Sequence, residues 1–554
     1  MTIPGLPSTN DPYARTTQVF PVLESEMVDR IRNFGNPETI EAGTVLFVRG
    51  SRLADFFVVL DGEIGIYRAG DRGAPVEQVL TVFSTGQFTG ELDHLRAQAP
   101  LVSARAITKA RVLRVPAADV RRLMAAEPDI AEIMMRAFIL RRMGVVHNGD
   151  AAITLLGAAS SVDTLRIERF VVRNGYPLRL ADAEGDPLAV AMAVELGLEA
   201  ADLPAVITVD NCILRNPTIP FLADRLGLAE KFDPEECWDV AVIGAGPAGL
   251  AAGTYAASEG LKTVVIEGLA PGGQAGTSSH IENYLGFPSG ISGQALAARA
   301  QIQAQKFGAR IAVSRAVIGL ESASAPFRLA LEDGQIVTAS ALVIASGARY
   351  RRLSVPGYDR FEGAGVHYAA TAMEAALCTG QTVVIVGGGN SAGQAAVFLS
   401  RNGGHVHILV RQAGLAATMS EYLVDRIARS QRISLHVFSE ITSLTGDKSL
   451  CEVEWTDVRN QKRSRISCGA LFVMIGAEPN SGWLRGRLPL DGKGFVLTGC
   501  DAAGQPLASP YATALPGIYA VGDVRAGSVK RVASGVGEGS VVIQDIHRFL
   551  GAMK

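Results

Sequence analysis

The stretch Trp238–Glu267 constrains the fold of this chain more than any other part of the sequence. It contains a short buried strand, a tight glycine turn, a helix, and a second strand that ends on the carboxylate of Glu267. A strand, turn, helix and strand in this order build half of a nucleotide-binding Rossmann unit. The stretch therefore predicts a parallel α/β domain with a site for an adenine dinucleotide.

The three glycines of its GxGxxG pattern have different tasks. Gly244 allows the tight turn, Gly246 lets a pyrophosphate approach the backbone, and Gly249 lets the helix pack closely on the strand. The pyrophosphate is expected at the N-terminal end of the helix, where backbone N–H groups are unpaired. Glu267 follows Gly246 by 21 residues, the usual distance of a carboxylate that bonds a ribose hydroxyl. The predicted contacts are Gly244, Gly246, Pro247, Ala248, Gly249 and Glu267.

Length and composition limit the possible classes of protein. A chain of 554 residues is expected to hold three or four domains. Its net charge of −3 gives no electrostatic reason to expect nucleic acid or an anionic membrane as a partner. There is no signal-peptide pattern and no apolar run of the ~20 residues that span a bilayer. Six scattered cysteines without a CxxC motif argue against a metal site and fit a reducing cytosol. We therefore expect a cytoplasmic location.

Residues 1–150 are predicted to form a β-roll followed by helices, because short strands alternate with turn signals from Glu38 to Val115. The segment resembles a cyclic-nucleotide-binding domain through FFVVLDGEIGIY and through FTGEL at 88–92. The resemblance implies that Gly90 and Glu91 hold a ribose. Pro100 stands where that family has the arginine that grips the cyclic phosphate, and Arg105 is the nearest alternative. Whether a cyclic nucleotide binds is left open.

Residues 151–232 alternate strands and helices in a different pattern, which resembles a thioredoxin or glutaredoxin fold. Leu203-Pro204-Ala205 stands in the place of that family's cis-proline turn. Ser161 and Thr164 occupy roughly the positions of its two cysteines. A hydroxyl with a very high pKa cannot carry out thiolate exchange, so we expect a docking or structural module.

The C-terminal 320 or so residues resemble bacterial thioredoxin reductase. The matching motifs are VAVIGAGPAGLAA, GGQ at 272–274, IENYLGFP at 281–288, LVIASGA at 342–348 and GIYAVGDV at 517–524. The resemblance implies a homodimer with an FAD domain at 233–354 and 480–554 and an NAD(P)H domain at 355–479. Lys530, Arg531 and Val532 replace three residues of that family whose backbone lies beside the isoalloxazine. The FAD contacts implied in this way are Gly273, Gln274, Asn283, Gly347, Gly522, Asp523, Arg531 and Val532.

A second dinucleotide pattern, GxGxxA, follows the strand at 382–386. Two such units in series fit one site for FAD and one for a nicotinamide nucleotide. Arg411 remains of the three arginines with which the family binds the 2′-phosphate of NADPH, so NADPH is favoured and NADH stays possible. The predicted contacts are Gly387, Gly389, Asn390, Ser391, Ala392 and Arg411.

The dithiol of thioredoxin reductase is missing from this chain. Where the family has Tyr-Cys-Ala-Thr-Cys-Asp, residues 368–373 are Tyr-Ala-Ala-Thr-Ala-Met. Ala369 and Ala372 have no thiol, so electrons cannot pass from the flavin to a disulfide by that route. Cys378 is the nearest possible substitute, and His280 is the one histidine beside a flavin motif that could protonate an acceptor.

The sequence thus predicts a multi-domain α/β protein with an N-terminal β-roll, a thioredoxin-like α/β module and two Rossmann-like domains. It is expected to be an FAD-dependent NAD(P)H oxidoreductase that passes electrons to a non-disulfide acceptor. Flavodoxin, ferredoxin, a quinone and oxygen are the possible acceptors, and no residue identifies one. The alternatives are disulfide reduction by a non-standard route and a flavin or nucleotide sensor that acts through the N-terminal modules. Hydride transfer itself requires no acid or base, so no catalytic residue is predicted.

Overall fold

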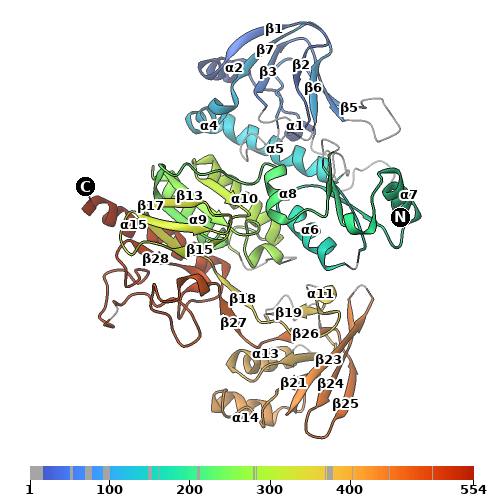
Figure 1. Cartoon of the computed structure of the whole chain (residues 1–554), viewed down its shortest axis with the longest axis vertical. Helices are drawn as coiled ribbons and strands as arrows, with labels where there is room; N and C mark the ends of the chain where they lie inside the picture. Colours follow the sequence, from blue (N-terminus) through green and yellow to red (C-terminus); the bar gives the residue numbers. More distant parts are fainter. Residues whose placement is uncertain are drawn as a thin grey trace.

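A computed structural model describes residues 16–49, 54–68, 78–90, 100, 102–147, 153–159, 161–208, 212–278, 281, 284–362, 364–368, 370, 378–401, 404–447, 449–501 and 503–553. The chain forms several packed units (Figure 1). A β-roll lies at one end, the second dinucleotide unit lies at the other, and the first dinucleotide unit lies between them beside a smaller α/β module. The expected multi-domain α/β architecture is confirmed. None of the helices among these residues is long and apolar enough to cross a bilayer.

The N-terminal unit consists of two small antiparallel sheets, in the orders β1-β7-β3 and β2-β6-β4-β5. Both faces of β3 are buried, because Phe57 and Val59 lie in the core of the roll while Phe56 and Val58 pack in a second core with the helices of the unit. Its strands are β1 (Asn36–Ile40), β2 (Val45–Phe47), β3 (Phe56–Asp61), β4 (Ile64–Arg68), β5 (Gln78–Phe83), β6 (Ser103–Ala106) and β7 (Ala110–Val115). Its helices are α1 (Thr16–Val19), α2 (Ser25–Ile31), α4 (Ala117–Ala126) and α5 (Pro128–His147).

The middle module, as we name the sheet β11-β10-β8-β9 with helices α6, α7 and α8, follows α5. β8 and β9 are parallel, and β10 runs antiparallel to β8. The Leu203–Pro204 peptide is cis, in agreement with the resemblance to thioredoxin. The elements are β8 (Ile153–Gly157), α6 (Val162–Arg173), β9 (Leu178–Asp182), α7 (Pro187–Glu195), β10 (Ala205–Ile207), β11 (Ile213–Arg215) and α8 (Ile219–Arg225).

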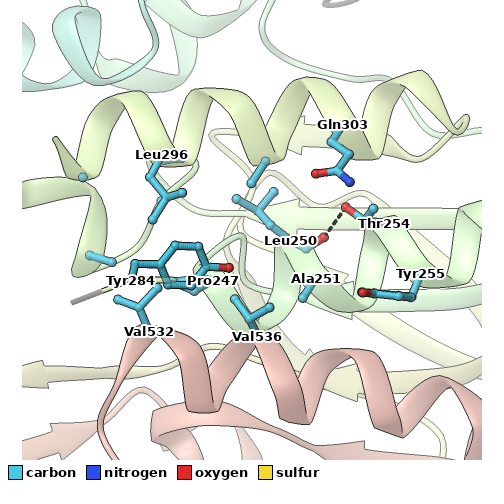
Figure 2. A pocket seen from close by; sticks show the side chains of 15 residues that line it. Pro247, Leu250, Ala251, Thr254, Tyr255, Tyr284, Leu296, Gln303, Val532 and Val536 are labelled. Carbon is cyan, nitrogen blue, oxygen red and sulfur yellow. Dashed lines mark hydrogen bonds between the residues drawn. The ribbon is translucent and has the colours of Figure 1, made fainter. Parts of the chain in front are cut away.

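The first dinucleotide unit is built on the sheet β14-β13-β12-β17-β16-β15, with β28 paired to β17. Its central strands β12, β13, β14, β17 and β28 are parallel, and α9 packs between α10 and α15 (Figure 2). The strands are β12 (Cys237–Ile243), β13 (Thr263–Glu267), β14 (Arg310–Val313), β15 (Val317–Leu320), β16 (Phe327–Leu331), β17 (Ile336–Ile344) and β28 (Ile518–Ala520). The helices are α9 (Pro247–Ser258), α10 (Gly293–Lys306) and α15 (Val532–Met553).

The second dinucleotide unit has a parallel sheet in the order β19-β26-β20-β21-β22 and an antiparallel sheet β23-β24-β25. Two chain passages connect it to the first unit, and they pair as β18 (Ala348–Tyr350) and β27 (Ala477–Pro479). Its strands are β19 (Val366–His367), β20 (Val383–Val386), β21 (Val406–Leu409), β22 (Ile433–His436), β23 (Ser439–Gly446), β24 (Leu450–Asp457), β25 (Lys462–Ser467) and β26 (Ala470–Val473). The helices are α11 (Tyr358–Phe361), α13 (Asn390–Arg401) and α14 (Glu421–Arg429).

The hydrophobic core of the middle module continues into the first dinucleotide unit. Phe170 of α6 and Leu222 of α8 belong to the same buried cluster as Val242 of β12 and Ile543 of α15. In the same way, Ile302 of α10 joins the core beneath the N-terminal β-roll. Because such cores are closely packed, both N-terminal units are fixed to the surface of the first dinucleotide unit.

Candidate functional site

The glycines of the first dinucleotide unit have the geometry that their spacing predicts. Gly244 has a φ of +104°, and a Cβ there would lie 2.4 Å from the carbonyl oxygen of Ala345. A Cβ on Gly249 would lie 1.8 Å from the carbonyl oxygen of Gly244, so the helix contacts the turn directly. Gly246 is less crowded, because the nearest neighbour of a Cβ added there would be the Cα of Gly273 at 3.8 Å. Its backbone is therefore open to a ligand.

Glu267 lies at the end of β13 with its carboxylate held by the backbone. Oε2 accepts a hydrogen bond from the N–H of Ala245 at 2.8 Å, and Oε1 accepts one from the N–H of Leu269 at 3.0 Å. These bonds fix the carboxylate beside the glycine turn, where a ribose hydroxyl is predicted.

A cavity of about 420 Å³ lies at the carboxyl ends of these strands. It brings together most residues predicted to contact FAD, together with Arg173, Tyr350, Asn480 and Lys530. Gly249 is absent from the wall because it packs against Gly244, and Asn283 lies outside the described residues. The predicted residues that line the cavity are Gly244, Gly246, Pro247, Ala248, Glu267, Gly273, Gln274, Gly347, Gly522, Asp523, Arg531 and Val532.

Two acidic groups lie at the turn of Gly522 and Asp523, which line this cavity. The N–H of Gly522 donates to Oε2 of Glu538 at 2.6 Å, and Glu538 is paired with Arg525 at 2.6 Å. Burial raises the pKa of the Asp523 carboxyl, while the positive charge of Lys530 opposes that rise. The Gly522 N–H is thus already bonded, and Asp523 is the polar side chain that this turn presents to the cavity.

A second cavity, of about 720 Å³, lies over the GxGxxA turn of the second unit. Gly387 has a φ of +140°, and a Cβ there would lie 2.4 Å from the carbonyl oxygen of Met474. Ala392 is fully buried in the core and does not line the cavity. Lys493 and Thr418 line it without having been predicted. The predicted residues in its wall are Gly387, Gly389, Asn390, Ser391 and Arg411.

The two cavities meet at Tyr350 and Lys530, because both residues line both cavities. Tyr350 lies on β18, which connects the two units. Its ring stacks on that of Tyr368, with ring centroids 5.0 Å apart and planes 8° apart. Two dinucleotides bound in these cavities would therefore approach each other at this aromatic pair.

A third cavity, of about 250 Å³, lies between α9, α10 and α15 and is largely apolar (Figure 2). Leu250, Leu296 and Val536 line it, and the hydroxyl of Thr254 donates to the carbonyl oxygen of Leu250 at 2.7 Å. It shares Pro247 and Val532 with the first cavity. Sequence periodicity does not reveal this pocket, because small apolar residues at these positions also fit ordinary helix packing.

Several predicted residues have no place in this geometry. His280, Glu91, Ala369 and Ala372 lie outside the described residues, as Asn283 does. In the middle module, Thr164 is fully buried and Ser161 is the N-cap residue of α6. No disulfide joins any of the six cysteines, all of which the structure describes. Among the described residues, no group of three or more His, Cys, Asp or Glu could hold a metal ion.

In the N-terminal β-roll, the arginines near the predicted nucleotide cradle contact the protein itself. The guanidinium of Arg105 lies over the ring of Tyr67, 4.5 Å from its centroid. Arg141 of α5 is buried and donates through Nη1 to the carbonyl oxygens of Phe88 and Gly90, each at 3.0 Å. Pro100 is buried. These contacts give both arginines a structural role.

Residues 238–539 match the family of pyridine nucleotide-disulphide oxidoreductases, which is more than half of the chain. The chain belongs to this family. Residues 37–127 match the cyclic nucleotide-binding domain, so the resemblances to thioredoxin reductase and to a cyclic-nucleotide-binding domain are confirmed. The chain is 31% identical to thioredoxin reductase of Rickettsia felis over 314 residues, which are 56% of this chain and 97% of the relative. It is 32% identical to NADPH-dependent thioredoxin reductase 3 of Arabidopsis thaliana, covering 61% of this chain and 65% of the relative.

Solved structures agree with this family membership. Thioredoxin reductase of Streptococcus pyogenes covers 57% of this chain and 99% of its own, with a TM-score of 0.51 and 29% identity. Thioredoxin reductase of Giardia duodenalis covers 57% of this chain and 100% of its own, with a TM-score of 0.52 and 28% identity. The protein is therefore an oxidoreductase of a family whose thioredoxin reductases use FAD and NADPH.

The first cavity fits FAD. The backbones of Gly246 and Gly273 lie against each other in its wall without side chains, because a Cβ on Gly273 would lie 3.0 Å from the Cα of Gly246. A Cβ on Gly347, which also lines it, would meet open space. Such a bare backbone beside a helix N-terminus suits a diphosphate, and the fixed carboxylate of Glu267 suits a ribose.

Proposed function

We propose that this protein is an NAD(P)H-dependent FAD oxidoreductase that passes electrons to an acceptor other than a disulfide. The observation that carries the proposal is the pair of cavities that meet at Tyr350 and Lys530. FAD, when bound, supplies hydride acceptance and onward electron transfer, and the protein supplies position and electrostatics. Family membership supports the two cofactors.

The residues of the first cavity divide by task in this proposal. The open backbone of Gly246 and Gly273 holds the diphosphate, and Glu267 holds the adenosine ribose. Asp523 holds the ribityl end, and Lys530, Arg531 and Val532 lie beside the isoalloxazine. In the second cavity, Gly387 and Gly389 hold the diphosphate of the nicotinamide nucleotide and Arg411 holds its 2′-phosphate. The remaining predicted contacts are Gly244, Pro247, Ala248, Gln274, Gly347, Gly522, Asn390 and Ser391.

Cysteine placement supports the non-disulfide route. No cysteine occurs among the described residues that line the two cavities. Cys378 and Cys468 are buried in the second unit, and burial raises the pKa of the Cys468 thiol to about 12. Since the thiolate is the reactive form, such a thiol is a poor electron relay. The sequence has alanine at positions 369 and 372, where the thioredoxin reductases that it resembles have their two cysteines.

Anaerobic titration with NADPH and with NADH tests the proposal directly. Either nucleotide should bleach the flavin absorbance with a stoichiometry of about one per FAD, and reoxidation should occur with one or more of flavodoxin, ferredoxin, a quinone and oxygen. Flavin that remains oxidised with both nucleotides would contradict the proposed reaction. Rapid reoxidation by a disulfide substrate would contradict the proposed acceptor class and favour the non-standard disulfide route.

The sensor hypothesis predicts a different result. Its motivating observation is that the N-terminal β-roll packs on α10 through Ile302, so it is joined to the first dinucleotide unit. A sensor would take up one equivalent of hydride without turnover by any acceptor and would change the protease sensitivity of residues 1–150. The domain boundaries, the homodimer and the cytoplasmic location also stay predictions, and size-exclusion chromatography with light scattering tests the homodimer.

A further inference from the structure

Arg173 belongs to the middle module but lines the cavity of the first dinucleotide unit. It is the last residue of α6, and its Nη2 donates a hydrogen bond to the carbonyl oxygen of Gly273 at 3.0 Å. The family match begins at residue 238. Arg173 therefore enters this cavity from outside the part of the chain that defines the family.

The end of α6 is fixed in this position by further contacts. Nδ2 of Asn174 donates to the carbonyl oxygen of Leu269 at 3.2 Å, and Nε2 of Gln294 donates to the carbonyl oxygen of Val172 at 2.7 Å. The apolar face of α6, including Phe170, belongs to the core that continues into the first unit. Because backbone carbonyls and a shared core hold the helix end, the guanidinium is preorganised toward the cavity.

The guanidinium has few protein partners for a partly buried cation. Among the described residues, the Gly273 carbonyl oxygen is its one hydrogen-bond acceptor, and no carboxylate forms an ion pair with it. Burial lowers the pKa of Arg173, and the charge of Glu267 opposes that shift. An arginine stays protonated in proteins and has five N–H donors. A partly buried cation whose N–H donors are not all bonded by the protein is stabilised by an anionic ligand.

The position of the guanidinium identifies which part of a ligand it would reach. Gly273 faces Gly246, since a Cβ on Gly273 would lie 3.0 Å from the Cα of Gly246. Gly246 is the N-cap of α9, where the helix end favours a phosphate. The guanidinium of Arg173 therefore bonds the residue that packs against the N-terminus of α9, and Arg173 and Gly246 line the same cavity.

We propose that Arg173 binds the diphosphate of FAD, so that the middle module completes the flavin site. This rests on the proposed function, because it takes the first cavity to be the FAD site. A module without a dithiol thereby has a specific role, which is to retain the flavin.

The test uses the full-length chain with its flavin removed, and FAD as the probe. FAD binding is measured by the quenching of flavin fluorescence for the wild type, Arg173→Met, Arg166→Ala and Gln294→Ala. Arg166 is the matched control, because it lies on the same helix and pairs with Asp163 on the exposed surface. Gln294→Ala removes a contact between the units and leaves the cation.

Arg173→Met should weaken FAD binding about 10- to 100-fold, the effect of one lost charge-assisted contact, and should reduce the salt dependence of binding. Arg166→Ala should bind FAD within about twofold of the wild type, and Gln294→Ala, which loosens the end of α6 but keeps the cation, should lose less affinity than Arg173→Met.

Each other outcome overturns a distinct statement. If Arg173→Met binds FAD as the wild type does, the role of Arg173 is refuted and the proposed function stands. If Gln294→Ala is as weak as Arg173→Met, general docking of the module, and not the arginine, retains FAD. If the wild-type apoprotein binds no FAD, the proposed function itself is wrong. If circular dichroism shows that Arg173→Met is unfolded, hydrogen exchange of the wild type tests the contact instead. FAD should slow exchange at residues 170–176 more than at the residues of α8. Equal or unchanged exchange would refute the contact.

Discussion

The rings of Tyr350 and Tyr368 stack with their planes 8° apart and their centroids 5.0 Å apart. The hydroxyl of Tyr368 donates to Oε1 of Glu362 at 2.6 Å and accepts from the hydroxyl of Tyr358 at 3.1 Å. Burial, together with the hydrogen bond to Glu362, raises the pKa of Tyr368, so this hydroxyl stays protonated at neutral pH. The network holds Tyr368 in place, and Tyr368 in turn supports the ring that lines both cavities.

Removal of the Tyr350 ring should slow the transfer between the two cofactors. An aromatic pair contributes about 0.5–1.5 kcal/mol. In Tyr350→Ala, NADPH should therefore reduce the flavin about 3- to 10-fold more slowly than in the wild type, as measured by anaerobic stopped flow. Tyr350→Phe keeps the stacked ring and should behave like the wild type. If Tyr350→Phe is as slow as Tyr350→Ala, the hydroxyl and not the stacking is responsible.

Two glycines of one turn should give opposite phenotypes. A Cβ at Gly246 would have its nearest protein atom at 3.8 Å, so Gly246→Val should fold but yield colourless protein, because the side chain occupies the diphosphate position. At Gly249 a Cβ would lie 1.8 Å from a backbone oxygen, so Gly249→Ala should lower the thermal unfolding midpoint. Flavin content and unfolding midpoints check both statements, and full FAD occupancy in Gly246→Val would refute the assignment of the site.

Sequence spacing alone located the turn residues and Glu267, because a diphosphate and a ribose impose fixed distances along one strand–turn–helix. It could not locate Arg173, Tyr350 or Lys493. These residues reach the cavities from other elements, and only tertiary packing brings them there.

The same limit applies to residues assigned by position in a motif. Ala392 completes the GxGxxA pattern but is fully buried, since the last small residue of such a motif serves helix–strand packing. Gly522 is implied to contact FAD, and its N–H is bonded to Glu538. A glutamate sixteen residues away on another helix has no local signal that relates it to this turn.

The preference for NADPH over NADH should be limited to what one arginine, Arg411, contributes. One charge-assisted contact contributes about 1.5–3 kcal/mol, so Arg411→Ala should raise the KM for NADPH about 10- to 100-fold and leave the KM for NADH nearly unchanged. Gln412→Ala, at the neighbouring cavity residue, is the control. A strong NADPH preference that survives in Arg411→Ala would indicate that another cation binds the 2′-phosphate, and Arg351 and Lys493 also line the second cavity.

Cyclic AMP and cyclic GMP should bind weakly or not at all to the N-terminal β-roll. The position of the phosphate-gripping arginine is Pro100, Arg105 lies over Tyr67, and Arg141 bonds backbone carbonyls. A buried phosphate would therefore lack its bidentate partner. Isothermal titration calorimetry should show no site of micromolar affinity. A tight site that disappears in Arg105→Ala would show that Arg105 leaves Tyr67 to bind the phosphate.

The protein should reduce its flavin with NAD(P)H but should not reduce thioredoxin or a small aromatic disulfide at a reductase-like rate. Alanines stand at 369 and 372, Ser161 and Thr164 stand at the second dithiol position, and no cysteine lines either cavity among the described residues. The double mutant Ala369→Cys with Ala372→Cys restores the relay, and Ala370→Cys with Ala372→Cys is its mismatched control, because one intervening residue breaks the spacing. Disulfide reduction gained only by the first mutant would identify the scaffold as a reductase that lacks its relay. Rapid thioredoxin reduction by the unmutated protein, retained after replacement of all six native cysteines, would refute the non-disulfide route.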